Sequence, residues 1–354
     1  MLPYNIELDE KTVLVTGAAG FIGSNLVMRL FHDFRNIKVI GIDSITDYYD
    51  VNIKHERLKE IESLNRDWTF VRASIADKDA VERIFSENRI SVVVNFAAQA
   101  GVRYSITHPD TYVQSNLIGF YNILEACRHY EVEHLVYASS SSVYGSNKKT
   151  PYSTDDKVDN PVSLYAATKK SNELMAHAYS KLYNIPSTGL RFFTVYGPAG
   201  RPDMAYFGFT DKLVKGETIK IFNYGNCKRD FTYVDDIVEG VVRIMQHAPE
   251  KENGEDGLPI PPYKVYNIGN SHPENLLEFV TILQEELVRA GVLPKDYDFD
   301  SHKELVPMQP GDVPVTYADT TPLEQDFAFK PSTSLRDGLR NFAEWYVKFY
   351  NTEK

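Results

Sequence analysis

A glycine-rich turn between an apolar strand pattern and a helical pattern constrains the fold of this chain most. Residues 12–16 (TVLVT) are apolar and β-branched, which predicts a buried strand. The segment 17–23 (GAAGFIG) follows, and a helical pattern runs from residue 21 to about residue 34. A strand, a glycine turn and a helix in this order predict the first half of a βαβ unit with an anion site at the turn.

Each glycine of the turn has its own part in this prediction. Gly17 permits a tight turn, Gly20 lets a pyrophosphate approach the backbone, and Gly23 lets the helix pack closely on the strand. Phe21 and Ile22 begin the helix, so their backbone lies at the same anion site. The turn is therefore predicted to bind a dinucleotide.

The next strand pattern indicates which dinucleotide is bound. Residues 38–42 are apolar and end at Asp43, twenty residues after Gly23, where a carboxylate accepts from an adenosine ribose hydroxyl. Asp43 would repel a 2′-phosphate, and Ser44 brings no compensating cation. The sequence therefore favours NAD over NADP.

Strand and helix patterns alternate through the first 194 residues. Strands are predicted at 68–72, 91–96, 134–138 and 187–192, and helices at 79–88, 109–130 and 163–183. This alternation predicts an α/β fold of the Rossmann type, a doubly wound parallel sheet with a ligand crevice at the carboxyl ends of the strands. Five candidate residues fall at or just past such ends: Gly17, Asp43, Ala97, Ser140 and Thr194.

The alternation breaks down after Thr194, which predicts a smaller interleaved α/β lobe. We expect an NAD-binding domain over 1–194, with returning segments at about 232–270 and 315–354. The segments 195–231 and 271–314 form the expected substrate-binding lobe. A helix at about 335–350 is expected to pack back on the main lobe, and the stretch 249–262 reads as an exposed loop.

A tyrosine and a lysine four residues apart mark the predicted helix at 163–183. Tyr165 and Lys169 lie on one face of such a helix, and Ser163 is suited to cap its start. The strand at 134–138 leads into four serines, 139–142. A phenol, an ammonium and hydroxyls at one sheet edge can handle the proton of a sugar hydroxyl.

Composition excludes several classes of protein. The 354 residues carry a net charge of −11, which argues against a nucleic-acid binder. Two cysteines make neither a disulfide framework nor a metal site, and no other metal site is expected. The sequence has neither a leader pattern nor an apolar run of 18 residues. We therefore expect a cytoplasmic protein without membrane segments.

Longer motifs resemble the extended short-chain dehydrogenase/reductase family over nearly the whole chain. They are 16–23 (TGAAGFIG), 139–145 (SSSSVYG) and 165–169 (YAATK). Within that family, 97–105 (AAQAGVRYS), 190–198 (LRFFTVYGP) and 308–313 (MQPGDV) resemble the UDP-glucuronate 4-epimerases. The resemblance implies reversible epimerisation between UDP-glucuronate and UDP-galacturonate, with bound NAD and a 4-keto intermediate.

The resemblance also implies roles for residues on both sides of the crevice. Tyr165 would take the proton from the sugar O4, Lys169 would bind the nicotinamide ribose, and Ser140 would bond to O4. Other cofactor contacts are expected from Ser74, Ile75, Ala97, Ala98 and Gln99. On the nucleotide side, Arg229 would hold the diphosphate, Phe222 would pack on the uracil and Asp312 would bind the ribose; each has a structural alternative.

Two features favour a uronic acid and its epimerisation. Related dehydratases have Asp and Glu, and related decarboxylases have Glu, where this chain has Ser141 and Ser142. A C6 carboxylate would be bound by Ser141, Ser142, Thr194 and Arg201, because a guanidinium pairs a carboxylate and hydroxyls complete its hydrogen bonding. Arg201 has two alternatives, a solvent-facing position in a loop or a structural ion pair with Asp203.

Three other functions stay open. The first is a 4-epimerase of UDP-glucose or UDP-N-acetylhexosamines, the second is a UDP-glucuronate decarboxylase, and the third is a non-catalytic NAD-binding protein. Helices at about 109–130 and 163–183 are of the kind that pair in homodimers of this family. Ile118, Phe120, Ile123, Met175 and Ala178 would either line that interface or face the sheet.

Overall fold

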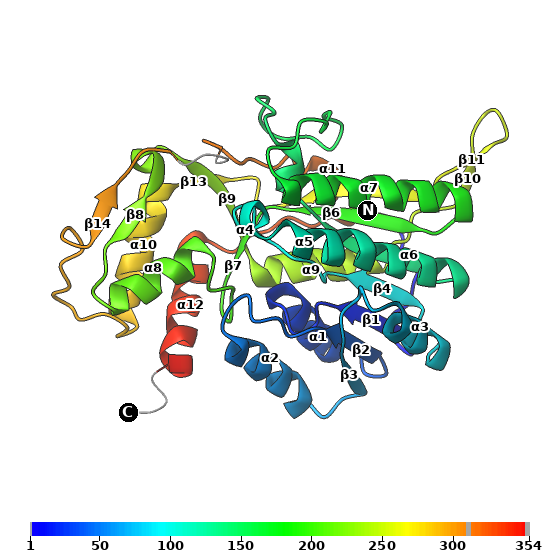
Figure 1. Cartoon of the computed structure of the whole chain (residues 1–354), viewed down its shortest axis with the longest axis horizontal. Helices are drawn as coiled ribbons and strands as arrows, with labels where there is room; N and C mark the ends of the chain where they lie inside the picture. Colours follow the sequence, from blue (N-terminus) through cyan, green and yellow to red (C-terminus); the bar gives the residue numbers. More distant parts are fainter. Residues whose placement is uncertain (1, 309–312, 351–354) are drawn as a thin grey trace.

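The computed structural model describes residues 2–308 and 313–350, and a seven-stranded parallel sheet forms its centre (Figure 1). The strand order is β12-β6-β5-β4-β1-β2-β3, so the order reverses between β1 and β4. The predicted doubly wound Rossmann-type sheet is confirmed. Its strands are β1 Thr12–Thr16, β2 Lys38–Asp43, β3 Trp68–Arg72, β4 Val92–Asn95, β5 His134–Ser140, β6 Ser187–Phe192 and β12 Tyr263–Ile268.

Helices cover both faces of the sheet because successive strand residues point to opposite faces. Val13 and Val15 pack in one core with α1 and α9, whereas Leu14 packs in a second core with α3 and α6. α7 lies beside α6 on that second face. The helices are α1 Phe21–Asp33, α2 Val51–Ser63, α3 Lys78–Glu87, α6 Gly119–His129, α7 Leu164–Tyr183, α9 Val234–Met245 and α11 Thr321–Phe327.

The helix predicted at 109–130 is not one regular helix. Short helices α4 Tyr104–Thr107 and α5 Pro109–Tyr112 lead into a π-helical turn, Val113–Ile118, before α6 begins. Asn116 of this turn is buried, and its amide donates to the Gln99 carbonyl (3.0 Å) and to Thr168 Oγ1 (3.0 Å). The wider turn therefore places a polar side chain between the exit of β4 and α7.

A smaller lobe rests on the carboxyl end of the sheet. β7 Thr194–Tyr196, β9 Lys228–Tyr233 and β13 Pro273–Asn275 form one sheet, and β8 Ile219–Ile221 pairs with β14 Lys303–Leu305. Its helices are α8 Ala205–Val214 and α10 Leu276–Arg289. Short 3₁₀ turns lie at Ser141–Tyr144 and Phe222–Gly225, and a small hairpin, β10 Glu252–Asn253 with β11 Pro259–Ile260, lies in the stretch expected to be a loop.

The last helix, α12 Leu335–Tyr350, packs on the smaller lobe (Figure 1). It lies against α10, its Phe342 contacts Tyr206 and Phe207 of α8, and Tyr346 donates to Asp211. The expectation that this helix returns to the main lobe is therefore wrong. Aromatic residues along one face of α12 pack against the aromatic residues of α8. Sequence periodicity alone does not show which element such a face packs against. The other domain limits stay predictions.

Candidate active site

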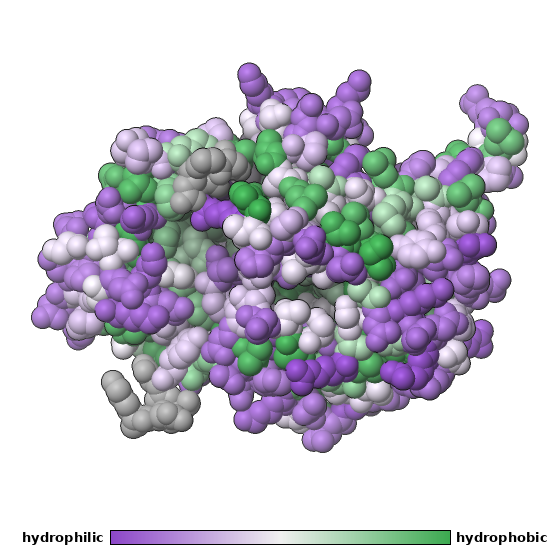
Figure 2. Space-filling model, in the orientation of Figure 1, coloured by the Kyte–Doolittle hydropathy of each residue, from purple (hydrophilic) through white to green (hydrophobic). Residues whose placement is uncertain are grey.

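Two adjoining cavities lie where the smaller lobe meets the sheet, and Figure 2 shows the hollow between them. The first runs along the glycine turn and the ends of β1, β2 and β4. The second, of about 1110 Å³, opens toward the smaller lobe and is large enough for a nucleotide sugar. Tyr165, Ser140 and Arg201 line both cavities, so the two ligand spaces meet there.

The glycine turn is as tight as the sequence predicts. Gly17 has a φ of +70°, and a Cβ there would lie 2.8 Å from the Ala97 nitrogen. A Cβ on Gly20 or Gly23 would lie 2.9 or 2.2 Å from the Gly17 carbonyl oxygen. The first turn of α1 has neither a side-chain cap nor an acidic residue, which leaves its backbone N–H groups for an anion. Phe21 and Ile22 of this turn line the first cavity.

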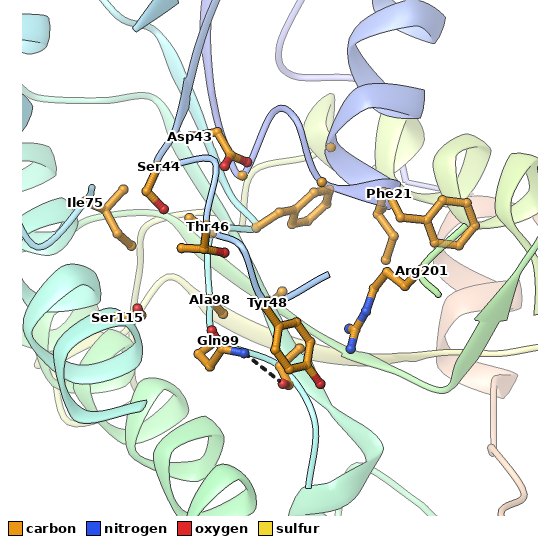
Figure 3. Close-up of a pocket in the computed structure, with 18 of the residues that line it drawn as sticks. Phe21, Asp43, Ser44, Thr46, Tyr48, Ile75, Ala98, Gln99, Ser115 and Arg201 are labelled. Atoms are coloured by element: carbon orange, nitrogen blue, oxygen red, sulfur yellow. Dashed lines mark hydrogen bonds between the residues drawn. The ribbon is translucent and has the colours of Figure 1, made fainter. Parts of the chain in front are cut away.

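Asp43 lines the same cavity beside Ser44, and Figure 3 shows both at the end opposite Arg201. Its carboxylate accepts from the Ala19 nitrogen (3.1 Å) and the Ile45 nitrogen (2.8 Å), so two backbone groups fix its position. This geometry fits a carboxylate that accepts hydrogen bonds from ribose hydroxyls.

Ser74 and Ile75, from which adenine contacts are predicted, line the first cavity. Ser74 Oγ accepts from the Ala76 nitrogen (3.1 Å), and the Ile75 carbonyl accepts from Asn122 (2.9 Å). The carbonyl of Ile75 is thus already bonded within the protein, and its apolar side chain packs in the second core beside Gly119. An adenine contact through that carbonyl would use its second lone pair, beside the bond from Asn122.

The exit of β4 lines the middle of the first cavity with Ala97, Ala98 and Gln99. Thr16 Oγ1 accepts from the Ala97 nitrogen (3.0 Å), and Asn116 accepts from the Gln99 nitrogen (2.8 Å). The side chain of Gln99 donates to the Ala100 carbonyl, the bond dashed in Figure 3. Small side chains and an immobilised backbone leave this space open for the cofactor.

Helix α7 brings Tyr165 and Lys169 to the meeting point of the cavities. Ser163 caps the helix by accepting from the Ala166 nitrogen (3.1 Å). Tyr165 is half-buried, and Lys169 is buried with its ammonium donating to the Ala138 carbonyl (2.9 Å). Ser140, at the end of β5, lines both cavities with Tyr165.

Electrostatics at this point depend on burial and on two neighbours. Burial raises the pKa of Tyr165, while a hydrogen bond from Ser140 and the charge of Arg201 lower it. Burial also lowers the pKa of Lys169 to about 8. A phenolate at neutral pH therefore needs positive charge close to Tyr165, and the Lys169 ammonium together with a cationic nicotinamide can supply that charge.

The predicted carboxylate-binding residues line the second cavity: Ser141, Ser142, Thr194 and Arg201. Ser142 Oγ donates to Ser140 Oγ (2.9 Å), which joins two serines of the run. The ion pair given above as one alternative for Arg201 is present, because its Nε and a terminal nitrogen donate to Asp203 (3.0 and 2.5 Å). Arg201 therefore faces the cavity with part of its charge already neutralised by Asp203.

The nucleotide side of the second cavity is lined by Phe222 and Arg229. The guanidinium of Arg103 lies over the Phe222 ring, 5.5 Å from its centroid. Arg229 donates to the carbonyls of Lys228 (3.0 Å) and Pro314 (3.3 Å), which directs it along this wall. Asp312 lies outside the described residues.

Sequence reasoning missed the segment 46–57, which adds further residues to the site. Tyr48 donates to Asp203 (3.1 Å) and lines both cavities, and Figure 3 shows it beside Arg201. Lys54 lines the first cavity and donates to the Thr46 carbonyl (2.6 Å). A cation therefore does lie near Asp43, although the sequence placed none beside it. In the sequence, only the aromatic and basic composition of this segment pointed to a role in the site.

The sequence of this chain is similar to a known family and to individual known proteins. The family model of the NAD dependent epimerase/dehydratase family matches residues 13–269. This chain belongs to that family. Protein CapI of Staphylococcus aureus is 51% identical over 96% of this chain and 99% of its own length. UDP-glucuronate 4-epimerase 4 of Arabidopsis thaliana is 44% identical over 97% of this chain and 77% of its own length.

The fold is also similar to that of a solved structure over nearly the whole chain. UDP-glucuronic acid 4-epimerase from Bacillus cereus, in complex with UDP-glucuronic acid and NAD, has a TM-score of 0.81 and 31% identity. The match covers 96% of this chain and 100% of that one. The first cavity of the present family member fits NAD, because a Cβ would fill the glycine cradle and Asp43 is directed by backbone groups.

No helix among residues 2–308 and 313–350 is long and apolar enough to cross a membrane. Over the same residues, no group of three or more His, Cys, Asp and Glu side chains is arranged to hold a metal ion.

Proposed function

We propose that this chain epimerises UDP-glucuronate and UDP-galacturonate at C4, with NAD as a bound cofactor. The observation that carries this conclusion is the meeting of two cavities at Tyr165, Ser140 and Arg201. One cavity has the glycine turn and Asp43 for the dinucleotide, and the other has Arg201 and neutral hydroxyls for a uronic acid. The relatives named as UDP-glucuronate 4-epimerases support the same function.

The residues at the meeting point divide the chemistry among them. Tyr165 takes the proton from the sugar O4 and returns it, and Ser140 bonds to the same oxygen and helps to relay that proton. Lys169 holds the nicotinamide ribose and stabilises the Tyr165 phenolate by its charge. Bound NAD supplies the hydride acceptor and donor for C4, so the reaction needs no net oxidant.

Ser141 and Ser142 explain why the 4-keto intermediate is returned rather than processed. A 4-keto uronic acid is a β-keto acid and loses carbon dioxide readily. Neutral hydroxyls at these positions do not act as the acids and bases that elimination needs, and they hold the carboxylate in place. This absence of carboxylic side chains disfavours the decarboxylase alternative.

One experiment tests the proposed function. The purified protein is incubated with UDP-glucuronate without added NAD, and the products are followed by NMR. We expect UDP-galacturonate and an equilibrium mixture, with NAD released when the protein is denatured. Formation of UDP-xylose, or turnover of UDP-galactose but not of UDP-glucuronate, would contradict the proposal.

The serines give a second test on the same products. Ser142→Glu places a carboxylic acid beside Ser140, so we expect leakage to a 4-keto pentose or to UDP-xylose. Ser146→Glu is a matched control, because Ser146 follows the serine run but lines neither cavity. Equal product ratios in wild type and Ser142→Glu would show that the serines do not decide between epimerisation and decarboxylation.

We also propose that the chain is a cytoplasmic homodimer. Apolar side chains are exposed on the π-helical turn and along α6 and α7, where Figure 2 shows hydrophobic surface: Val113, Ile118, Tyr121, Leu174, Leu182 and Tyr183. Phe120 and Ile123 instead face the sheet, and Met175 packs beside them, whereas Ala178 is exposed. Leu174, which is 60% exposed, is suited to a test. We expect Leu174→Glu to give monomers in light scattering; a wild-type monomer would contradict the proposal.

A further inference from the structure

Arg57 of α2 is a buried cation with an unusual set of partners. Its side chain points away from solvent, and the residue is 1% exposed. Nε and one terminal nitrogen donate to the Ala199 carbonyl (3.0 and 2.6 Å), and that nitrogen also donates to the Gly200 carbonyl (3.0 Å). The other terminal nitrogen donates to the Ala19 carbonyl (2.9 Å) and to Tyr49 Oη (2.9 Å). The whole guanidinium fork is thus used.

These partners belong to two segments that bind different ligands. Ala19 lies inside the glycine turn, between Gly17 and Gly20, on the cofactor side. Ala199 and Gly200 directly precede Arg201, which lines the space for the sugar. One side chain therefore ties the cofactor turn to the substrate loop across more than 140 residues of sequence.

The tethered loop needs an external restraint to keep its shape. Ala199 has a φ of +50°, which is unfavourable for a residue with a Cβ. Gly200 lies so close to Tyr206 that a Cβ would meet the phenol oxygen at 1.7 Å. Carbonyls that point into the protein require donors, because an unpaired buried polar group destabilises the fold. Arg57 provides those donors to both carbonyls.

Tyr49 completes the tether from the cofactor side. Its phenol oxygen accepts from Arg57, and its ring lies below the guanidinium, 5.7 Å from centroid to Cζ. Tyr49 also lines the first cavity. The buried positive charge is thus stabilised by carbonyl dipoles, a phenol and an aromatic face.

We propose that Arg57 is a positioning residue that sets the selectivity of the site for a uronic acid. It acts by fixing the loop that presents the Arg201 guanidinium relative to the glycine turn. This inference rests on the proposed function, since it takes Arg201 as the group that meets the C6 carboxylate. Arg229 and Phe222, on the nucleotide side, make no described contact with Arg57 or with residues 197–203. Loss of the tether should therefore weaken recognition of the carboxylate and spare recognition of UDP.

Arg57→Lys tests this inference, because it keeps the charge but loses the planar fork. The holoenzyme is titrated by calorimetry with UDP-glucuronate, UDP-glucose and UDP. Wild type is expected to prefer UDP-glucuronate over UDP-glucose by at least tenfold. In Arg57→Lys we expect this preference to fall at least threefold, with the affinity for UDP unchanged within twofold.

Arg66→Lys is the matched control. Arg66 donates to the backbone carbonyls of Phe31, Phe34 and Arg35, and its guanidinium lies over the Phe31 ring, so it has the same chemistry away from both cavities. We expect it to cost stability but to leave the preference for the uronic acid unchanged. If Arg57→Lys does not fold, Tyr49→Phe removes one partner of the fork and should lower the preference at least twofold.

The outcomes separate this inference from the proposed function. A wild-type enzyme without preference between the two sugars would overturn this inference, whereas the proposed function fails only if the product assay shows no epimerisation of UDP-glucuronate. A wild-type preference that survives in Arg57→Lys would overturn the role of Arg57 alone. A parallel loss of affinity for UDP and UDP-glucuronate would show a structural role only, and would also overturn it.

Discussion

The cofactor side and the sugar side of the site are built in different ways. On the cofactor side, a glycine turn and the ends of adjacent parallel strands form the wall, and Gly17 lies directly against Ala97, two residues past the end of β4. On the sugar side, Arg201 comes from a loop, Phe222 from a 3₁₀ turn and Arg229 from the start of β9, and side-chain hydrogen bonds hold the loop and Arg229 in place. Backbone geometry thus defines one half, and long-range polar contacts define the other.

The largest effect is expected where the halves meet. Tyr165→Phe removes the group that takes the proton from O4, so we expect kcat to fall about 10³-fold, within the usual range for general acid–base catalysis. The bound NAD content should stay the same, because the ring still fills its place. Product formation by NMR and the NAD released on denaturation measure the two quantities.

Tyr179→Phe serves as the control on the same helix. Tyr179 donates to Glu125 and lines neither cavity, so its loss should leave kcat within twofold. If Tyr165→Phe kept more than a tenth of the wild-type kcat, Tyr165 would not be the group that transfers the proton. The two halves of the site would then not meet at the reacting residue.

Gly17→Ala tests whether backbone geometry alone defines the cofactor half. Its Cβ would lie 2.8 Å from the Ala97 nitrogen and 2.9 Å from the Phe96 carbonyl carbon, so the turn must open. We expect NAD retention to fall at least tenfold, while calorimetry shows UDP binding unchanged. Gly216→Ala is the control, because Gly216 has a similar φ of +68° but open space around it. Equal NAD loss in both variants would mean that strain, and not the close approach, is responsible.

Arg201→Ala sharpens the sugar half. We expect a rise in KM or a fall in kcat for UDP-glucuronate of more than tenfold, because the pairing of a guanidinium with a carboxylate is lost. Affinity for UDP should stay within twofold, whereas Arg229→Ala should weaken UDP and UDP-glucuronate together. An effect of Arg201→Ala below threefold would remove Arg201 from the carboxylate site and leave its pair with Asp203 as its only role.

The smallest effect on activity is expected from the sheet that carries both halves. His134 is buried in β5, and its nitrogens contact Thr188 Oγ1 and the Met245 carbonyl. Burial lowers its pKa to about 4 from 6.5. The unfolded chain therefore binds more protons below pH 6.5, and stability falls as the pH drops toward 4.

His134→Gln cannot titrate but keeps hydrogen-bonding groups. We expect its melting temperature to fall less steeply than that of wild type between pH 6.5 and 4, with epimerisation near pH 7.5 unchanged. Scanning calorimetry at several pH values measures both slopes. Parallel slopes would assign the acid sensitivity to other groups.

The sequence predicted the cofactor half well because its signals are local. The parallel sheet, the glycine turn and the position of Asp43 each follow from short patterns of apolar residues and glycines. The sugar half was predicted through family resemblance, and its geometry was not foreseen. The pair between Arg201 and Asp203 was only one of two alternatives, and nothing in the sequence joined Arg57 to Ala199.

Two further differences have the same physical origin. The final helix was expected on the main lobe, but aromatic contacts of Phe342 with Tyr206 and Phe207 hold it on the smaller one. Lys54 was missed near Asp43 because it lies eleven residues further along the chain, on a helix that the alternating pattern did not reveal. Contacts between side chains that are distant in sequence leave no periodic signal.

The π-helical turn before α6 sets a limit on changes in chain length. A π turn closes with i→i+5 hydrogen bonds, one residue more than an α-helix, so deleting one residue from Val113–Ile118 would let the segment close as a regular α turn. Asn116 would then no longer meet both Gln99 and Thr168, although every other residue kept its identity. A substitution of exposed Gln114 should therefore be tolerated, whereas Val113 and Ile118 belong to the proposed dimer surface and insertions or deletions would change the turn itself. A designer who shortens loops in this enzyme should leave residues 113–118 at their present length.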